Sequence, residues 1–139
     1  MVGEPRGRIL LVDDDDSIRQ VVTVFLTDEG YDVAGAADGQ AALNQVETFK
    51  PDIILLDLRM PVMDGWEFVR LYRDLPGPHA PIVAFVAALH PRAVQEEIGA
   101  AALLEKPFDL DDLLVALDQA KTYTVVPTSA QSQANFASL

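Results

Sequence analysis

Hydrophobic positions along the chain follow two alternating patterns. Short continuous apolar runs, such as residues 9–12 and 53–56, are typical of strands that are buried on both faces of a parallel sheet. Longer segments with an apolar residue at every third or fourth position, such as residues 18–26, indicate amphipathic helices. The pattern predicts strands over residues 8–12, 31–34, 52–57, 81–86 and 102–104, and helices over residues 17–29, 39–48, 64–73, 91–98 and 109–121.

Signals at the helix ends support these boundaries. Gly30 follows the first helix where a C-terminal cap belongs, and Pro91 suits the first turn of the fourth. Asp109 is placed to cap the fifth helix, and Phe108 to pack against Leu113. The alternation of strand and helix implies βαβ units, and so an α/β protein. Five strands and five helices in this order resemble the flavodoxin-like doubly wound (βα)5 fold, in which a five-stranded parallel sheet has the order 2-1-3-4-5.

Charged residues stand where three of the predicted strands end. Asp57 closes the third strand, the acidic run 13–16 follows the first, and Lys106 follows the fifth. The carboxyl ends of parallel strands share one edge of a sheet, where open α/β sheets bind ligands, so we expect these side chains to meet. Four adjacent carboxylates repel one another, and a bound cation relieves that repulsion. The sequence therefore predicts a metal site beside Asp57, with Asp15 and Asp16 as helix caps or solvent-facing residues.

Four short motifs together resemble the receiver domain of bacterial two-component response regulators, the CheY-like superfamily. Each motif alone is common, but their order and spacing are specific. They spread over most of the chain, and they are Leu-Val-Asp-Asp at 11–14 with Arg19, Asp57 with Met-Pro-Val-Met-Asp-Gly at 60–65, Gly-Ala at 99–100, and Lys-Pro-Phe at 106–108.

The resemblance implies a role for each residue at this edge of the sheet. Asp57 is the phosphoacceptor, and Asp14 and Asp57 are direct ligands of Mg²⁺. Asp13 orients metal-bound water, and the backbone carbonyl of Arg59 supplies a further oxygen to the metal site. Lys106 contacts Asp57 and then a phosphoryl oxygen. Mg²⁺ is the expected cofactor, and its preference for oxygen ligands agrees with this set of residues.

The implied function is phosphoryl-group signalling rather than enzymatic turnover, with catalysis limited to self-phosphorylation and self-dephosphorylation. The expected partners are a histidine kinase or phosphotransfer protein as donor, and an output protein or domain that the sequence does not name. The net charge of −12 opposes direct binding to nucleic acid or to anionic membranes. The chain has no cysteine, no signal peptide and no apolar stretch of membrane-spanning length, so we expect a soluble cytoplasmic protein.

Composition predicts three regions along the chain. Residues 1–7 form an N-terminal extension, and residues 8–121 form the receiver domain. Residues 122–139 carry no charged side chain and are rich in Ser, Thr, Gln and Ala, which is typical of a flexible tail or the start of a linker.

Two positions depart from the family pattern. Val86 stands where the fourth strand ordinarily ends in Thr or Ser, and valine has no hydroxyl to donate to a phosphoryl oxygen. Leu103 stands where the fifth strand ordinarily carries an aromatic residue. In the family both positions couple phosphorylation to a conformational change, so we expect atypical coupling here. The segment 86–99 is also about two residues shorter than usual, which indicates a truncated loop or fourth helix.

Two other functional classes stay open. The chain could be a receiver-like interaction module that acts largely without phosphorylation. An aspartate-nucleophile phosphatase is disfavoured, because such enzymes commonly place a second acid two residues after the nucleophile, where this chain has Arg59. His79 and His90 lie beside prolines in predicted loops, and we interpret them as surface residues rather than phosphorelay histidines.

Overall fold

A computed structural model describes residues 6–87 and 91–122 of the 139-residue chain. Residues 1–5 and 123–139, which make up most of the predicted extension and tail, lie outside the described residues. Strands and helices alternate in the order β1 (Arg8–Val12), α1 (Asp16–Asp28), β2 (Asp32–Ala36), α2 (Gly39–Phe49), β3 (Ile53–Asp57), α3 (Gly65–Asp74), β4 (Ile82–Ala87), α4 (Pro91–Ile98), β5 (Ala102–Lys106) and α5 (Leu110–Thr122).

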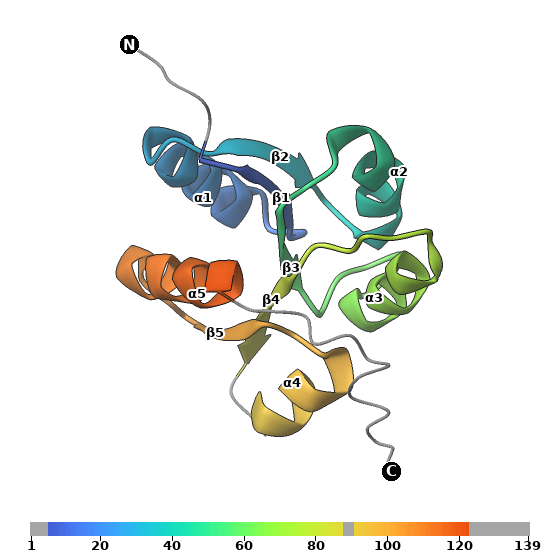
Figure 1. Ribbon diagram of the computed structural model, residues 1–139. Helices are drawn as coiled ribbons and strands as arrows, with labels where there is room; N and C mark the ends of the chain where they lie inside the picture. Colours follow the sequence, from blue (N-terminus) through green and yellow to red (C-terminus); the bar gives the residue numbers. More distant parts are fainter. Residues whose placement is uncertain (1–5, 88–90, 123–139) are drawn as a thin grey trace.

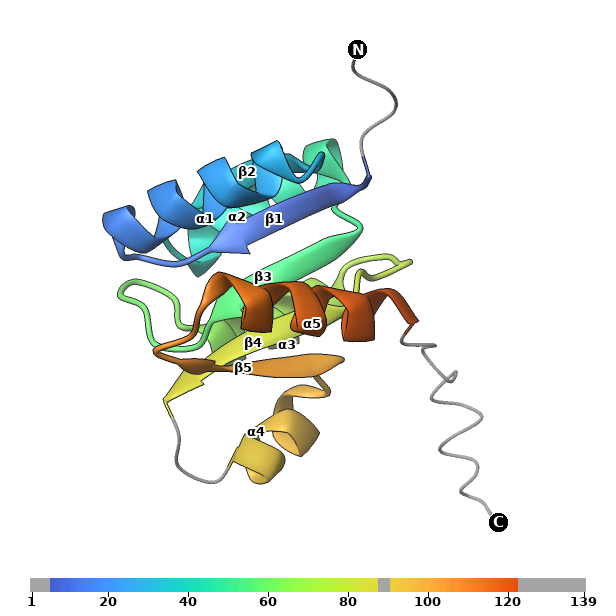
Figure 2. The ribbon, with the colours of Figure 1, turned by 90° about the vertical axis from the view of Figure 1, so that its left-hand side faces the viewer.

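The five strands form one parallel sheet in the order β2-β1-β3-β4-β5, as the sequence predicts. Helices α1 and α5 cover one face of the sheet, and α2, α3 and α4 lie on the other (Figures 1 and 2). The doubly wound architecture places the carboxyl ends of β1, β3 and β5 along one edge. Within the described residues, no helix is both long enough and apolar enough to cross a membrane.

Two apolar layers hold this sandwich together. Successive strand residues point to opposite faces, so Ile54 and Leu56 of β3 pack under α2 and α3, while Ile53 and Leu55 pack under α1 and α5. All four of these side chains are at most 4% exposed. A strand buried on both faces needs a continuous apolar run, which is why β3 shows no polar alternation before Asp57.

The observed strands β3 and β4 differ by one residue from the predicted bounds, and the larger differences are in β2 and β5. β2 begins at Asp32 and ends at Ala36, two residues beyond the predicted end, because it pairs along the whole of β1 up to Val12. Gly35 and Ala36 have low strand propensity, so the sequence alone did not extend the strand. β5 continues to Lys106, which pairs with Ala87 of β4. Lys106 is therefore the last residue of a strand rather than the first residue of a loop.

Aspartates cap several helices in the way the sequence indicates. The Asp15 side chain accepts hydrogen bonds from the amides of Ser17 and Ile18 at the start of α1, and Asp64 accepts one from Glu67 at the start of α3. At the start of α5, the side chain of Asp109 accepts a hydrogen bond from the amide of Asp112 at 2.8 Å. Asp111 and Asp112 lie in the first turn of that helix. The shortest of the described helices is α4, with eight residues.

Candidate functional site

Asp57 is held at the end of β3 by the turn that follows it. The Gly65 amide donates to the carbonyl of Leu58 at 3.0 Å, which folds the first residue of α3 back onto the strand end. A Cβ atom at Gly65 would lie 2.7 Å from the Leu58 Cα and 2.8 Å from the Asp57 carbonyl oxygen. Only glycine allows this approach without displacing the backbone, so the Asp-Gly pair fixes the start of α3 against Asp57.

The acidic run after β1 places one carboxylate in the interior. Asp13 is fully buried, and its amide donates to the carbonyl of Ala36 at the end of β2. One carboxylate oxygen of Asp13 accepts from the Asp15 amide at 2.9 Å. Asp14 is exposed, and it forms no hydrogen bond or ion pair with another residue in the part of the chain that the structure describes.

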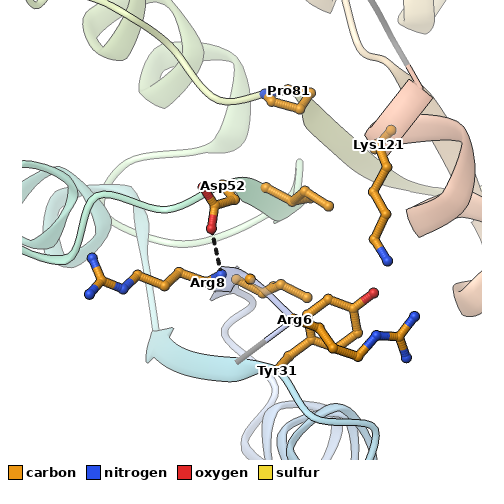
Figure 3. A pocket seen from close by; sticks show the side chains of 10 residues that line it. Arg6, Arg8, Tyr31, Asp52, Pro81 and Lys121 are labelled. Carbon is orange, nitrogen blue, oxygen red and sulfur yellow. Dashed lines mark hydrogen bonds between the residues drawn. The ribbon is translucent and has the colours of Figure 1, made fainter. Parts of the chain in front are cut away.

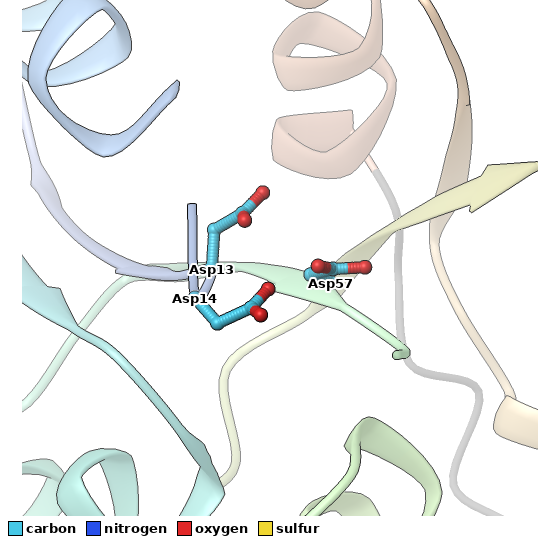
Figure 4. A group of neighbouring side chains, drawn as sticks. All are labelled: Asp13, Asp14 and Asp57. Carbon is cyan, nitrogen blue, oxygen red and sulfur yellow. The ribbon is translucent and has the colours of Figure 1, made fainter. Parts of the chain in front are cut away.

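Carboxylates from two strand ends meet at this edge of the sheet. Asp13, Asp14 and Asp57 each offer an oxygen, and the three oxygens lie within 4.8 Å of one another (Figure 4). Asp13 and Asp14 come from the end of β1, and Asp57 from the end of β3 beside it. Clustered carboxylate oxygens are the donors that Mg²⁺ and Ca²⁺ prefer, so the donor set fits the predicted hard cation.

Lys106 supplies the positive charge opposite these carboxylates. Its ammonium donates to Asp13 at 3.1 Å and lies 3.5 Å from a carboxylate oxygen of Asp57. Burial lowers the pKa of Lys106, but its hydrogen bonds and charge interactions with both aspartates outweigh burial and raise it above 10.5. The lysine therefore stays charged. The sequence predicts a contact of Lys106 with Asp57, which lies 3.5 Å away, whereas its shorter contact is with Asp13.

Asp57 is the carboxylate that the site perturbs most clearly. Its side chain is 10% exposed, and burial raises its pKa from 3.8 to about 6. The charges of Asp13 and Asp14 add to this increase, while the hydrogen bond from the Arg59 amide and the charge of Lys106 oppose it. The ionised form of Asp57 is thus disfavoured in the folded protein. A cation bound among the three carboxylates would relieve this cost.

The backbone of Arg59 lies at the site. Its backbone amide donates to the Asp57 carboxylate at 3.2 Å. The use of its carbonyl as a metal ligand stays a prediction. Phe85 is a neighbour that the sequence analysis did not single out. It pairs with Asp57 across the sheet, and its ring lies 5.6 Å from the Lys106 ammonium. An aromatic residue on β4, level with Asp57 at the end of β3, is the signal that could have identified it.

Val86 and Leu103 both belong to the apolar layer beneath α2, α3 and α4. Val86 is 6% exposed and pairs with Glu105 of β5, one step beyond the pair of Asp57 and Phe85. Leu103 is half-buried on the neighbouring strand. Their side chains carry no polar atom, so neither position can form a hydrogen bond with a group at the strand ends.

Of the two histidines, only His79 lies within the described residues. His79 lies in the loop between α3 and β4 rather than on a helix, as expected. It is half-buried, with a ring nitrogen 2.7 Å from the Leu75 carbonyl and its ring packed edge-on against Tyr72. His90 lies outside the described residues.

A basic pocket of about 380 Å³ opens at the opposite edge of the sheet, where the strands begin (Figure 3). Lys121 and Arg6 approach the ring of Tyr31 within 5.0 Å. The pocket does not gather free positive charge, however. Arg6 lies 3.7 Å from Glu29, and Arg8 lies 3.9 Å from Asp32. The carboxylate of Asp52 also lines it and accepts a hydrogen bond from the Arg8 amide. The acidic edge is therefore the stronger candidate site.

The sequence is similar to those of known proteins. The sequence matches the family described as response regulator receiver domain over residues 9–118. It is 40% identical over 111 residues to the DNA-binding response regulator MtrA of Mycolicibacterium smegmatis, covering 78% of this chain and 48% of that protein. It is 36% identical over 129 residues to the response regulator MprA of Mycobacterium bovis, covering 91% of this chain and 56% of that protein. The chain thus spans about half the length of these curated relatives.

Solved structures agree with the sequence comparison. The chemotaxis response regulator CheY4 of Vibrio cholerae superposes with a TM-score of 0.72 at 38% identity, covering 81% of this chain and 97% of that one. A response regulator from Chloroflexus aurantiacus superposes with a TM-score of 0.76 at 30% identity, covering 84% and 97%.

The raised pKa of Asp57 predicts a pH-dependent gain in stability for Asp57→Asn in metal-free protein. The cost of ionising Asp57 is absent below its unfolded pKa of 3.8, grows as pH rises towards about 6, and is complete at neutral pH. Removing the charge should therefore stabilise the protein at pH 7 by on the order of 2–3 kcal/mol, and should change little near pH 4. Urea unfolding with a chelator at both pH values measures the difference.

The matched control for this experiment is Glu47→Gln, which removes an exposed carboxylate from α2. Its stability should be close to that of wild type at both pH values. A loss of stability in Asp57→Asn at pH 7, or a gain of equal size at both pH values, would contradict the assigned electrostatics.

Proposed function

The chain belongs to the response regulator receiver domain family, and we propose that it accepts a phosphoryl group on Asp57 and thereby changes its binding to an output partner. The observation that carries this proposal is the meeting of Asp57 with Asp13, Asp14 and Lys106 at one sheet edge. Receiver domains are signalling domains rather than conventional enzymes. Any catalysis by this chain is limited to its own phosphorylation and dephosphorylation.

Mg²⁺ is the proposed cofactor, held by Asp14 and Asp57, with Asp13 orienting its water and the Arg59 carbonyl as a further ligand. The three carboxylate oxygens within 4.8 Å of one another support a small oxygen-preferring cation. When bound, Mg²⁺ neutralises negative charge that would otherwise keep a phosphoryl group away from the carboxylates. The exposed position of Asp14 leaves a path from solvent to the site.

In the proposed reaction, a carboxylate oxygen of Asp57 attacks the phosphorus of a phosphohistidine. A new oxygen–phosphorus bond forms while the phosphorus–nitrogen bond breaks, and the leaving imidazole keeps the electron pair and takes a proton from solvent. Lys106, already 3.5 Å from Asp57, then contacts a phosphoryl oxygen as a point charge.

The phosphoryl donor is proposed to be a histidine kinase or a phosphotransfer protein that docks beside the acidic edge. An apolar groove of about 850 Å³ lies next to Lys106, between the start of α1 and the start of α5. It is lined by Ile18, Val21, Phe108 and Leu110, and Val21 is 56% exposed. A partner seated there would bring its phosphohistidine close to Asp57. Because histidine kinases make phosphohistidine from ATP, we assign the reaction to the cytoplasm.

The proposed receiver domain extends over residues 8–121, with residues 1–7 as an extension and 122–139 as a tail or linker. The relative MtrA is named a DNA-binding regulator, but this chain covers 48% of it. We propose that the region described here does not itself bind nucleic acid. Its support is the net charge of −12, which repels a phosphate backbone.

Coupling between phosphorylation and conformational change is proposed to be atypical. Val86 and Leu103 replace the hydroxyl and aromatic residues that couple the two in the family, and both pack in an apolar layer. The alternative function is an interaction module that works largely without phosphorylation. Labelling with a phosphoryl donor separates this alternative from the proposed phosphoacceptor function.

Mg²⁺ should raise the melting temperature of the wild type as the site fills, because a ligand that binds only the folded state stabilises it. Asp14→Ala should respond much less, since it removes a proposed direct ligand. Differential scanning calorimetry across a Mg²⁺ series measures both responses. Asp28→Ala, at the exposed far end of α1, is the control and should respond like wild type. Equal responses from Asp14→Ala and wild type would place the metal elsewhere.

Incubation with Mg²⁺ and acetyl phosphate should add one phosphoryl group to the wild type, as measured by intact mass. Asp57→Asn should gain none, because no other described carboxylate stands at a central strand end within reach of both the acid pair and Lys106. Asp64→Asn, which alters only the cap of α3, should still be labelled. Equal labelling of Asp57→Asn would refute the acceptor assignment, and an unlabelled wild type would favour the interaction module.

Val86→Thr should enlarge the conformational response to a phosphoryl mimic. The added hydroxyl can donate to the mimic, and a hydrogen bond to a charged group contributes roughly 1.5–3 kcal/mol, enough to shift a two-state equilibrium more than tenfold. Amide chemical shifts in β4 and β5 at saturating beryllofluoride and Mg²⁺ measure the response. Saturation ensures that weaker binding is not mistaken for weaker coupling.

Val33→Thr provides the control, because it makes the same change at a half-buried position on β2. Urea unfolding of both variants accounts for the cost of burying a hydroxyl without a partner. If the wild type responds as fully as Val86→Thr, residue 86 serves packing alone and the altered-coupling idea fails.

A further inference from the structure

Arg19, in the first turns of α1, contacts two residues of the acidic run. One guanidinium nitrogen donates to the backbone carbonyl of Asp13 at 2.7 Å, and another donates to the Asp16 carboxylate at 2.5 Å. The side chain is 24% exposed, so it is partly withdrawn from solvent. A planar guanidinium can bridge two oxygens in this way because its donors are fixed in a fork.

These contacts give each acid in the run a different role. Asp13 is buried and bonded to Lys106, Asp15 caps α1, and Asp16 pairs with Arg19. Within the described residues, only Asp14 of the four has no partner. Arg19 thus binds the residues on both sides of Asp14, one through its backbone and the other through its side chain. These two bonds therefore span the turn between β1 and α1 that carries Asp14.

We infer that Arg19 is a positioning residue for the cation and phosphoryl site: its bridge between the Asp13 carbonyl and the Asp16 carboxylate fixes the turn that presents Asp14. This inference rests on the function proposed above. Within the described residues, Arg19 forms no hydrogen bond with the side chains of Asp14 or Asp57, so it acts through the backbone that carries them.

Replacing Arg19 by an uncharged residue removes both its charge and its bridge, and these two losses should change the Mg²⁺ affinity in opposite directions. Removing a positive charge beside a cation site should tighten Mg²⁺ binding, because it removes repulsion. Losing the bridge should weaken binding, because Asp14 is then held less firmly. Loss of an outer partner of a metal ligand typically costs tenfold or more in affinity. The sign of the change therefore separates the two effects.

The experiment measures the Mg²⁺ affinity of the whole chain from amide chemical shifts of residues 13–16 and 57–59. Arg19→Gln should bind Mg²⁺ about tenfold more weakly than wild type. Arg19→Lys keeps the charge but cannot span both oxygens, so its binding should also be weaker. Arg70→Gln is the matched control, since Arg70 forms the same kind of pair with Glu67 on α3 and is 65% exposed. Its affinity should equal that of wild type.

Urea unfolding without Mg²⁺ confirms that each variant is folded under the titration conditions. Should Arg19→Gln fail to fold, Arg19→Lys alone decides, because charge predicts no change for it and positioning predicts weaker binding. Affinity equal to or tighter than wild type in the folded variants overturns the inference, while the proposed function stands. A wild type without Mg²⁺-induced shifts overturns both.

Discussion

The ion pair of buried Asp13 with partly exposed Lys106 is the interaction on which the acidic edge depends. A fully buried carboxylate is strongly unfavourable unless a counter-charge accompanies it, and here the lysine ammonium lies 3.1 Å away. β5 and β1 are not neighbours in the sheet, since β3 and β4 lie between them. Lys106 therefore reaches across two strands, and Asp57 at the end of β3 lies beside its path. The contact that stabilises Asp13 also brings the Lys106 ammonium close to Asp57, the proposed acceptor.

The sequence predicted the parallel sheet, and it predicted that charged residues gather at the carboxyl ends of the strands. Both predictions follow from strong local signals. Continuous apolar runs mark buried parallel strands, and the charges at 13–16, 57 and 106 follow those runs directly. The sequence did not predict which carboxylate Lys106 contacts most closely, because that depends on side-chain reach across the sheet. It also missed the last residues of β2, since Gly35 and Ala36 are placed by pairing with β1 rather than by propensity. The individual contacts of residues 13–16 likewise depend on the three-dimensional shape of the turn that carries them.

Contacts between helices connect the end of β3 to α4 without Val86 or Leu103. Trp66, in the first turn of α3, donates its indole hydrogen to Glu97 of α4 at 3.0 Å. Arg73, near the end of α3, donates to the carbonyls of Ile98 and Gly99 where α4 ends. Because Gly65 holds the start of α3 against Asp57, these bonds form a continuous physical connection from Asp57 to α4. The apolar layer and this polar connection lie on the same face of the sheet (Figure 1).

The two edges of the sheet also differ in their balance of charge. At the amino edge, Arg6 and Arg8 each face a carboxylate, so that surface is close to neutral. At the carboxyl edge, the four acids after β1 and Asp57 outnumber the cations that face them. The domain is thus electrically polar along its strands, and its field attracts a positively charged surface to the carboxyl edge first. Such steering acts over about 10 Å at 0.1 M salt, so the rate of encounter with a basic partner depends on ionic strength.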